Sequence, residues 1–364
     1  MTTQHVETLI IGAGQAGLAT AHHLQRLGRP FLVVDGHRRV GDNWREQWDT
    51  LKLYSPAKYD GLPGLAFPAD GKSFPGKDQV ADYLETYALH DDLPVRMSTR
   101  VDQLDARAGG GFVATVGDDT ITCDNVVVAT GSFGRTPNVP DLAAELDPTI
   151  QQLHSSEYRR PGQLVEGRVL VVGASHSGCD IAYEAASTRP TTLVGRDCGQ
   201  IPVRWDSGMI HVLFPVLLFA WRHVLTRRTP IGRKEMASIR HHGGPMLRVK
   251  REHLAQRGVE RLPGRVVGVR DGLPLLDDGR VVEAASVVWC TGFRQAFDWI
   301  KLPVFGEDGY PQEYRGVVSA APGLFFCGLS FQFAFASMVL PGVGRDAEYV
   351  ARQIAARART PLAA

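Results

Sequence analysis

The chain has 364 residues, of which 44% are hydrophobic, and its 40 basic and 39 acidic residues leave a formal net charge of +1. This length is sufficient for two domains with buried cores. The balanced charge argues against a nucleic-acid-binding protein, because contact with a phosphate backbone needs a basic excess. Residues 1–7 are short and polar rather than a secretory leader, so a cytoplasmic location is expected.

After this polar start, an apolar run over residues 8–11 enters a glycine turn. Gly12, Gly14 and Gly17 form this turn and precede a predicted helix over residues 16–27. Glycine permits a tight reversal after a parallel strand and lets a pyrophosphate approach the backbone at the start of a helix. The next predicted strand ends at Asp35, whose carboxylate would accept hydrogen bonds from a ribose 2′-hydroxyl and repel a 2′-phosphate. The turn therefore predicts a site for FAD or NAD.

A long irregular stretch, residues 36–76, comes next. Its many prolines and glycines favour a structured loop, and loops of this length inside a compact domain are usually functional. Beyond it the pattern predicts an amphipathic helix and three strands, expected over residues 79–89, 95–97, 112–116 and 125–128.

A second glycine turn repeats the first at an offset of 161 residues, which is the separation of Gly12 and Gly173. It contains Gly173, Ser175, Ser177 and Gly178, and it also lies between an apolar run and a predicted helix. One isolated turn of this kind is weak evidence, because glycine loops are common. Two copies with the same flanking elements strongly indicate two nucleotide-binding units.

The same offset carries Asp35 onto Arg196 and Gly131 onto Gly292. A guanidinium binds a phosphate through two hydrogen bonds, so Arg196 predicts an NADPH site in the second copy. The two strands that end near Gly131 and Gly292 are expected to mark the places where the chain crosses between the units.

These patterns predict an α/β fold with two Rossmann-like dinucleotide-binding domains, the second inserted into the first. We expect a discontinuous FAD-binding domain over residues 1–150 and 293–364, and an NADPH-binding domain over residues 151–292. A helix expected over residues 344–358 would return to complete the first domain.

The cysteines restrict the chemistry. No two of the five form a CxxC pair, and no Cys/His cluster has the spacing of a metal site. Disulfide reductases with such double nucleotide folds pass electrons from the flavin to an adjacent dithiol, so electrons must leave this chain by another route. The five are Cys123, Cys179, Cys198, Cys290 and Cys327.

Residues 209–225 form an apolar run that contains Pro215 and Arg222 and is shorter than the ~20 apolar residues needed to span a bilayer. Ordinary packing is the usual explanation of such a run, and two further interpretations remain open: a helix that packs over the mouth of the active site, and an interfacial contact with a membrane surface. The basic residues that follow it are expected on a solvated face: Arg227, Arg228, Arg233 and Lys234.

The chain resembles the class B flavoprotein monooxygenases, in the flavin-containing monooxygenase branch that includes the plant YUCCA-type enzymes. Beyond the glycine turns, four segments carry the resemblance. Residues 41–53 resemble the GGxW segment beside the flavin, residues 154–158 the second half of the FxGxxxHxxxY signature, residues 178–182 the helix after the NADPH turn, and residues 290–293 the ATGY/F crossing.

The chain also departs from this family's pattern. Pro148 and Ile150 stand in place of the Phe and Gly of the signature, Ser175 replaces the middle glycine of the second turn, and His176 stands where asparagine is frequent. Ser55 lies near the position of an asparagine that, in the family, helps to hold NADP⁺ and the oxygen adduct.

The resemblance implies an NADPH-dependent monooxygenase. NADPH would reduce FAD, the reduced flavin would form a hydroperoxide with O₂, and one oxygen atom would pass to a small organic substrate, either a heteroatom or a keto-acid carbonyl. It also implies that Gly41 and Trp44 flank the flavin and that Ser55 takes part in catalysis. Neither the substrate nor the oligomeric state follows from the sequence.

Two other functions are compatible with the same residues. One is an NADPH-dependent flavin reductase or dehydrogenase that passes electrons to a quinone or another acceptor without oxygen transfer. The other is a binding protein that senses dinucleotides. The fold alone does not separate these functions, since it binds the same cofactors in each case.

Overall fold

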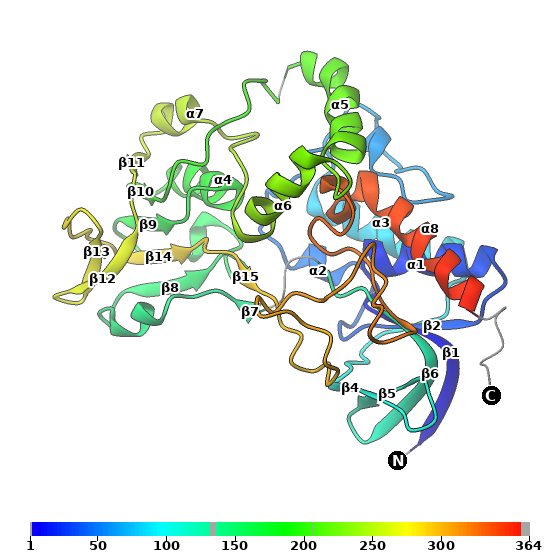
Figure 1. Cartoon of the computed structure of the whole chain (residues 1–364). Helices are drawn as coiled ribbons and strands as arrows, with labels where there is room; N and C mark the ends of the chain where they lie inside the picture. The colour runs from blue at the N-terminus through cyan, green and yellow to red at the C-terminus, as the bar shows by residue number, and fades with distance from the viewer. Residues whose placement is uncertain (1, 132–135, 206, 358–364) are drawn as a thin grey trace.

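The computed structural model describes residues 2–131, 136–205 and 207–357, which form two large sheets flanked by helices and two small two-stranded sheets (Figure 1). Both large sheets are built around parallel strands. Helices connect successive parallel strands, as in doubly wound folds. The predicted α/β fold with two Rossmann-like units is confirmed.

The first sheet has the strand order β3-β2-β1-β6-β5-β4, and β16 also pairs with β6. The strands β1, β2, β3, β6 and β16 run parallel, whereas β5 and β4 are antiparallel additions at one edge. Their bounds are β1 Thr3–Ile11, β2 Phe31–Val34, β3 Val95–Arg96, β4 Gln103–Ala106, β5 Phe112–Val116, β6 Asp119–Val128 and β16 Leu324–Phe326.

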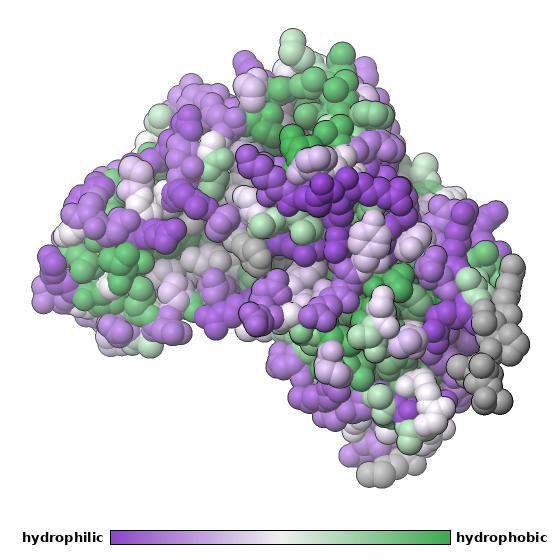
Figure 2. Space-filling view, in the orientation of Figure 1, coloured by the Kyte–Doolittle hydropathy of each residue, from purple (hydrophilic) through white to green (hydrophobic). Residues whose placement is uncertain are grey.

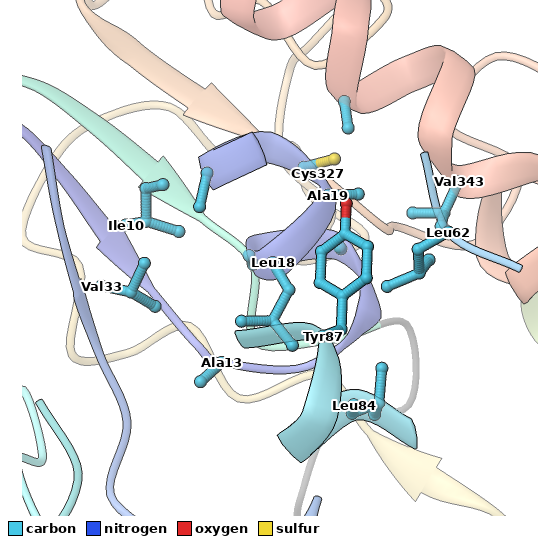
Figure 3. Close-up of a cluster of buried hydrophobic side chains, with 14 of the residues drawn as sticks. Ile10, Ala13, Leu18, Ala19, Val33, Leu62, Leu84, Tyr87, Cys327 and Val343 are labelled. Atoms are coloured by element: carbon cyan, nitrogen blue, oxygen red, sulfur yellow. The ribbon is translucent and has the colours of Figure 1, made fainter. Parts of the chain in front are cut away.

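Both faces of this sheet are covered. Ile10 packs into one buried cluster, while its neighbours Leu9 and Ile11 point to the opposite face and join another, as the two-residue period of a strand requires. Figure 3 shows the first cluster, in which side chains of the sheet meet those of α1, α3 and α8. The helices are α1 Gln15–Arg26, α3 Lys77–His90 and α8 Leu340–Arg357.

The second sheet is parallel throughout, with the order β11-β10-β9-β14-β8. A hairpin of β12 and β13 lies beyond it, and α4 and α7 pack on it. The bounds are β8 Gln151–His154, β9 Val169–Val172, β10 Thr191–Val194, β11 Glu260–Leu262, β12 Val266–Arg270, β13 Leu273–Leu276, β14 Ser286–Trp289, α4 His176–Ala185 and α7 Arg251–Gln256.

Two connections join the sheets. The short strands β7 (Thr136–Pro137) and β15 (Phe293–Arg294) pair antiparallel, so the two chain crossings run side by side. A helical segment above them comprises α5 (Met209–Phe219), a π-helical turn (Ala220–Val224) and α6 (Pro230–His241) (Figure 1).

The remaining described helices are short. They are α2 (Asp42–Arg45) and the 3₁₀ helices Ala57–Tyr59, Asp141–Glu145, Pro161–Gln163 and Phe335–Met338. The predicted strand over residues 125–128 is the end of the longer β6, and β4 was not predicted. The C-terminal helix begins at Leu340 rather than at residue 344, and Ala358 lies outside the described residues.

Candidate functional site

The first glycine turn reverses the chain between β1 and α1. Gly12 has a φ of +112°, and its N–H donates to the carbonyl of Val34 at 2.8 Å. A Cβ atom at Gly17 would overlap the carbonyl oxygen of Gly12, so only glycine fits where α1 crosses the turn. The space beside Gly14 is open, and no described side chain caps the helix. The first N–H groups of α1 are therefore available to an anion.

The second turn has the same backbone. Gly173 also has a φ of +112°, its N–H donates to the carbonyl of Val194 at 2.7 Å, and a Cβ at Gly178 would overlap the Gly173 carbonyl oxygen. Ser177 lies in the first turn of α4, and no described side chain caps this helix either. The repeat predicted from the sequence is thus present as two copies of one backbone geometry.

The predicted correspondence of Asp35 and Arg196 is wrong by one residue. In the sheets, Val34 pairs with Ile11, and Val194 pairs with Val172. Asp35, which follows Val34, therefore corresponds to Gly195, whose Cβ would lie 2.5 Å from the backbone nitrogen of Ala174. The connection that leads to β10 is one residue shorter than the one that leads to β2, so the offset of 161 residues no longer holds at the ends of these strands. Arg196 is one position farther along.

Asp35 is tied to the first turn. Its carboxylate accepts hydrogen bonds from the N–H of Ala13 at 2.8 Å and from the backbone N–H and ring Nδ1 of His37 at 2.8 and 2.7 Å. Burial raises the pKa of Asp35, but the hydrogen bonds from His37 and Ala13 outweigh it and keep the pKa below its usual range. A carboxylate has about four acceptor positions, so one on Oδ2 is left for a ribose hydroxyl.

The second turn is covered where the first is open. Ser175 occupies the place of Gly14, and its hydroxyl donates to the carbonyl of Gly244 at 3.0 Å. The segment of Gly243 and Gly244 lies so close that a Cβ at Gly243 would overlap the Ser175 side chain. A phosphate that binds this turn must therefore share the space with a polypeptide segment.

Arg196 is exposed, and its guanidinium makes no hydrogen bond or ion pair with the described residues. The adjacent Asp197 is held by Arg251 at 2.7 Å and Arg261 at 3.4 Å. The hydrogen bond from Arg251 lowers the pKa of Asp197 to about 2, so its carboxylate stays ionised. The neighbouring arginines balance this negative charge. The cluster keeps an excess of positive charge, which suits a 2′-phosphate.

Gly41 and Trp44 stand at the boundary of the two units. Gly41 has a φ of +86° and lies against the backbone of Ala81 in α3, which fixes the start of α2. Trp44 is half-buried against the first core, whereas Trp48, four residues later, belongs to the core of the second unit. The segment that the resemblance places beside the flavin thus passes from one unit to the other.

Tyr54 joins this segment to the second turn. Its hydroxyl donates to Asp180 of α4 at 3.0 Å, Arg248 pairs with the same carboxylate oxygen at 2.9 Å, and the Tyr54 ring lies 5.2 Å from that of His176. Burial raises the pKa of Asp180 despite these partners. The indole N–H of Trp205 donates to the Tyr54 carbonyl at 2.8 Å. Residue 55 is thereby held at the junction of the two units.

Ser55 has a partner that the sequence analysis missed. Its hydroxyl donates to Oδ1 of Asp60, a fully buried residue whose Oδ2 has no hydrogen-bond partner among the described residues. Burial raises the pKa of Asp60 to about 7, although the hydrogen bond from Ser55 opposes the shift. An acid in a proline-rich loop follows no periodic pattern, so only its spacing of five residues from Ser55 was visible in the sequence.

The two crossing glycines lie near the paired strands β7 and β15. Gly131 and Gly292 have φ values of +96° and +80°. The Gly292 carbonyl accepts hydrogen bonds from the N–H of Asn138 at 3.0 Å and from Nε2 of His154 at 2.9 Å. His154 is therefore a buried residue that braces the crossing.

Both turns fit a dinucleotide. Each offers uncapped N–H groups at a helix start behind a glycine without room for a Cβ atom. The first has an acid that can accept a ribose hydroxyl, and the second has nearby a cation, Arg196, that pairs with none of the described residues. The loop of residues 36–76 reaches the second turn's helix through the hydrogen bond between Tyr54 and Asp180.

Comparisons with known proteins agree with this arrangement. Residues 9–200 match the family model described as pyridine nucleotide-disulphide oxidoreductase. An uncharacterized CzcO-like oxidoreductase of Geobacillus kaustophilus is 35% identical over 96% of this chain and 99% of its own length. The probable indole-3-pyruvate monooxygenase YUCCA7 of Arabidopsis thaliana is 28% identical over 95% of this chain and 87% of its own.

A solved structure shows the same likeness in three dimensions. The flavin-containing monooxygenase of Stenotrophomonas maltophilia has a TM-score of 0.77 and 25% identity, and the match covers 98% of this chain and 99% of that protein.

Proposed function

Since the chain belongs to the pyridine nucleotide-disulphide oxidoreductase family, in its class B flavin monooxygenase branch, we propose that it is an FAD- and NADPH-dependent monooxygenase that transfers one oxygen atom to a small organic substrate. The observation that carries this proposal is the pair of equivalent glycine turns, one beside an acid and one near a cation that has no partner among the described residues.

The first unit would hold FAD. Gly12, Gly14 and Gly17 leave room for its pyrophosphate at the start of α1, Asp35 would accept a ribose hydroxyl, and Trp44 would flank the ring system. When bound, the flavin supplies hydride acceptance and the activation of O₂. The protein would supply the position of the cofactors and hydrogen bonds to them.

The second unit would hold NADPH. Gly173, Ser175, Ser177 and Gly178 surround the place for its pyrophosphate, and Arg196 would bind the 2′-phosphate through two hydrogen bonds. We propose the domain limits expected from the sequence, residues 1–150 with 293–364 and residues 151–292, because β8 and β14 belong to the second sheet and β16 and α8 to the first.

We propose that Ser55 contacts the reacting groups and that Asp60 is its positioning residue. When Asp60 is ionised, the Ser55 hydroxyl donates its proton to the carboxylate and presents only lone pairs to the junction. When Asp60 is protonated, it donates to Ser55, and the hydroxyl proton is free to point toward the junction. Asp60 thus determines whether Ser55 acts as an acceptor or a donor.

The test is isotopic. Purified protein with FAD, NADPH and ¹⁸O₂ would be incubated with 2-keto acids, sulfides and amines; keto acids come first because relatives are named indole-3-pyruvate monooxygenases. Oxygen transfer predicts about one labelled oxygen in the product for each NADPH consumed. Unlabelled product with quinone reduction would support the reductase, and a protein whose flavin is not bleached by NADPH would support the sensor.

Small-molecule substrate and O₂ are the partners that follow from this proposal. Contact with a membrane surface through residues 209–225 and self-association are further proposals, which vesicle binding and a measured solution mass would test. The cytoplasmic location expected from the sequence stays a prediction.

A further inference from the structure

The helix α5 has an apolar face that no described residue covers. Met209, Val212, Val216 and Phe219 recur every three or four residues, so they lie along one side of the helix, and they are between 61% and 77% exposed. Figure 2 shows this hydrophobic patch over α5. A patch of four large side chains on one surface helix is unusual for a protein surface that faces only water.

This face is not needed to hold α5 in place. The opposite side of the helix carries Ile210, Phe214 and Leu218, which are buried. They pack, with Trp205, against aromatic residues of the 36–76 loop, among them Tyr54 and Tyr59. The helix is therefore anchored to the loop that contains Ser55, and the exposed face is free to meet something outside the molecule.

The charge of the segment is one-sided. From residue 209 to residue 234 there is no acidic residue, and the first one to follow is Glu235, next to Lys234 on α6. Arg222 and Arg227 are used inside the molecule, where they bind the Pro341 carbonyl and Glu313. The basic residues at the surface are Arg228, Arg233 and Lys234, and Figure 2 shows a hydrophilic band along the border of the α5 patch.

We infer that the α5 face docks onto a lipid surface rich in anionic headgroups, with its four apolar side chains in the interface and the surface cations at the headgroups. Apolar contact and electrostatic attraction together are what an interfacial helix uses. The contact stays at the surface, because among the described residues no helix is long and apolar enough to cross a bilayer.

A second copy of the chain is the competing occupant, and the charge disfavours it. A two-fold contact through α5 would bring the Arg228, Arg233 and Lys234 cluster of one copy toward the same cluster of the other, without acids from the segment to compensate. Anionic headgroups are complementary to the same cluster.

The experiment is co-sedimentation of the flavin-loaded protein with phosphatidylcholine vesicles, with or without a quarter of phosphatidylglycerol. We expect binding to the anionic vesicles, several-fold weaker binding to the neutral ones, and weakening in about 0.5 M salt. The variant V212Q/V216Q/F219Q should lower the partition coefficient at least about tenfold while it keeps its bound flavin and its NADPH oxidation rate.

Leu89 of α3 supplies a matched control, since it is also 77% exposed but lies outside the α5 face. The variant L89Q should bind anionic vesicles like the wild type. Lack of binding to both vesicle types, or an equal loss in L89Q, would overturn the inference. A wild-type dimer that the triple variant converts to monomer would assign the face to a second copy instead.

Discussion

At the first glycine turn the side of Gly14 is open, whereas at the second Ser175 stands in the same place under the Gly243–Gly244 segment. The leading glycines, Gly12 and Gly173, have the same φ of +112°. The strands that precede the two turns pair with their neighbours in the same register. The residues that we propose to select the nucleotide differ too. Asp35 is tied to the first turn by hydrogen bonds, whereas Arg196 makes no contact of this kind with the described residues of the second turn.

The comparison separates two roles of sequence. The glycines fix a backbone that can bind any dinucleotide, because its N–H groups and helix start carry no preference for one nucleotide. The choice of nucleotide lies in side chains that the repeat does not constrain. The first turn is open to a ligand, whereas at the second a ligand must share the space with the Gly243–Gly244 segment.

The largest effect is expected from Gly17→Ala. Its Cβ would overlap the Gly12 carbonyl oxygen, so the turn must open and FAD affinity should fall by at least about a thousandfold, measured by flavin retention and titration. Gly178→Ala should abolish NADPH binding with the flavin retained. Gly162→Ala, at a glycine with open space around it, is the control. Normal flavin affinity in Gly17→Ala would show that the first turn does not need glycine at this position to bind the flavin.

Asp60→Asn tests the junction between the turns. The pKa of Asp60 in the folded protein, about 7, lies above its ordinary value of 3.8, so the folded state holds a proton that the unfolded state has lost between these values. Stability from this group therefore falls as pH rises from about 4 to 7 and is constant above, by up to about 4 kcal/mol.

The asparagine variant lacks this loss. Relative to the wild type, its free energy of unfolding should increase between pH 5 and pH 8, as measured by denaturant titration at each pH. The ratio of peroxide released to NADPH consumed should also lose its pH dependence near neutrality, which a merely structural role would not change. A stability difference that is the same at both pH values would refute a buried titrating carboxyl.

Arg196→Ser should raise the Kd of NADPH about 10- to 100-fold and leave that of NADH unchanged, because a charge-assisted pair of hydrogen bonds to the 2′-phosphate is lost. Arg270→Ser, at another exposed arginine, is the control. Equal loss for NADH and NADPH would mean that Arg196 does not distinguish them.

The smallest effect is expected from Ser175→Gly, which makes the second turn resemble the first. It removes the hydroxyl that holds the Gly244 carbonyl and frees space beside the turn. The Kd of NADPH should fall about threefold to tenfold, measured by fluorescence titration of the flavin-loaded protein. Weaker binding would show that the hydroxyl serves the ligand rather than the covering segment.

The sequence was informative where spacing and glycine determine the backbone. The apolar runs, the turns and the strand ends at residues 128 and 289 keep one offset, so the two units could be found without a structure. The offset failed at Asp35 and Arg196, because a single missing residue between α4 and β10 leaves no trace in composition. Asp60 was missed because burial, not pattern, gives it its properties.

The cover on the second turn was equally hidden. Gly243 and Gly244 lie almost seventy residues after Ser175 in sequence and meet it only through the packing of the segment that follows α6. Contacts of this kind depend on the tertiary arrangement of a connection with no regular period, which local preferences do not encode.

The antiparallel pairing of β7 and β15 bears on how the halves move. The two chain crossings lie side by side along one short line. The Asn138 N–H donates a hydrogen bond to the Gly292 carbonyl, and the Arg294 side chain donates one to the Asn138 side chain. Any rotation of one unit about this line would also have to break the packing of Trp48 in the second core and the hydrogen bond from the Asp49 N–H to the Arg159 carbonyl at 2.9 Å. The second unit is thus fixed to the first at several separate places, the paired crossings and the Tyr54–Asp180 hydrogen bond among them.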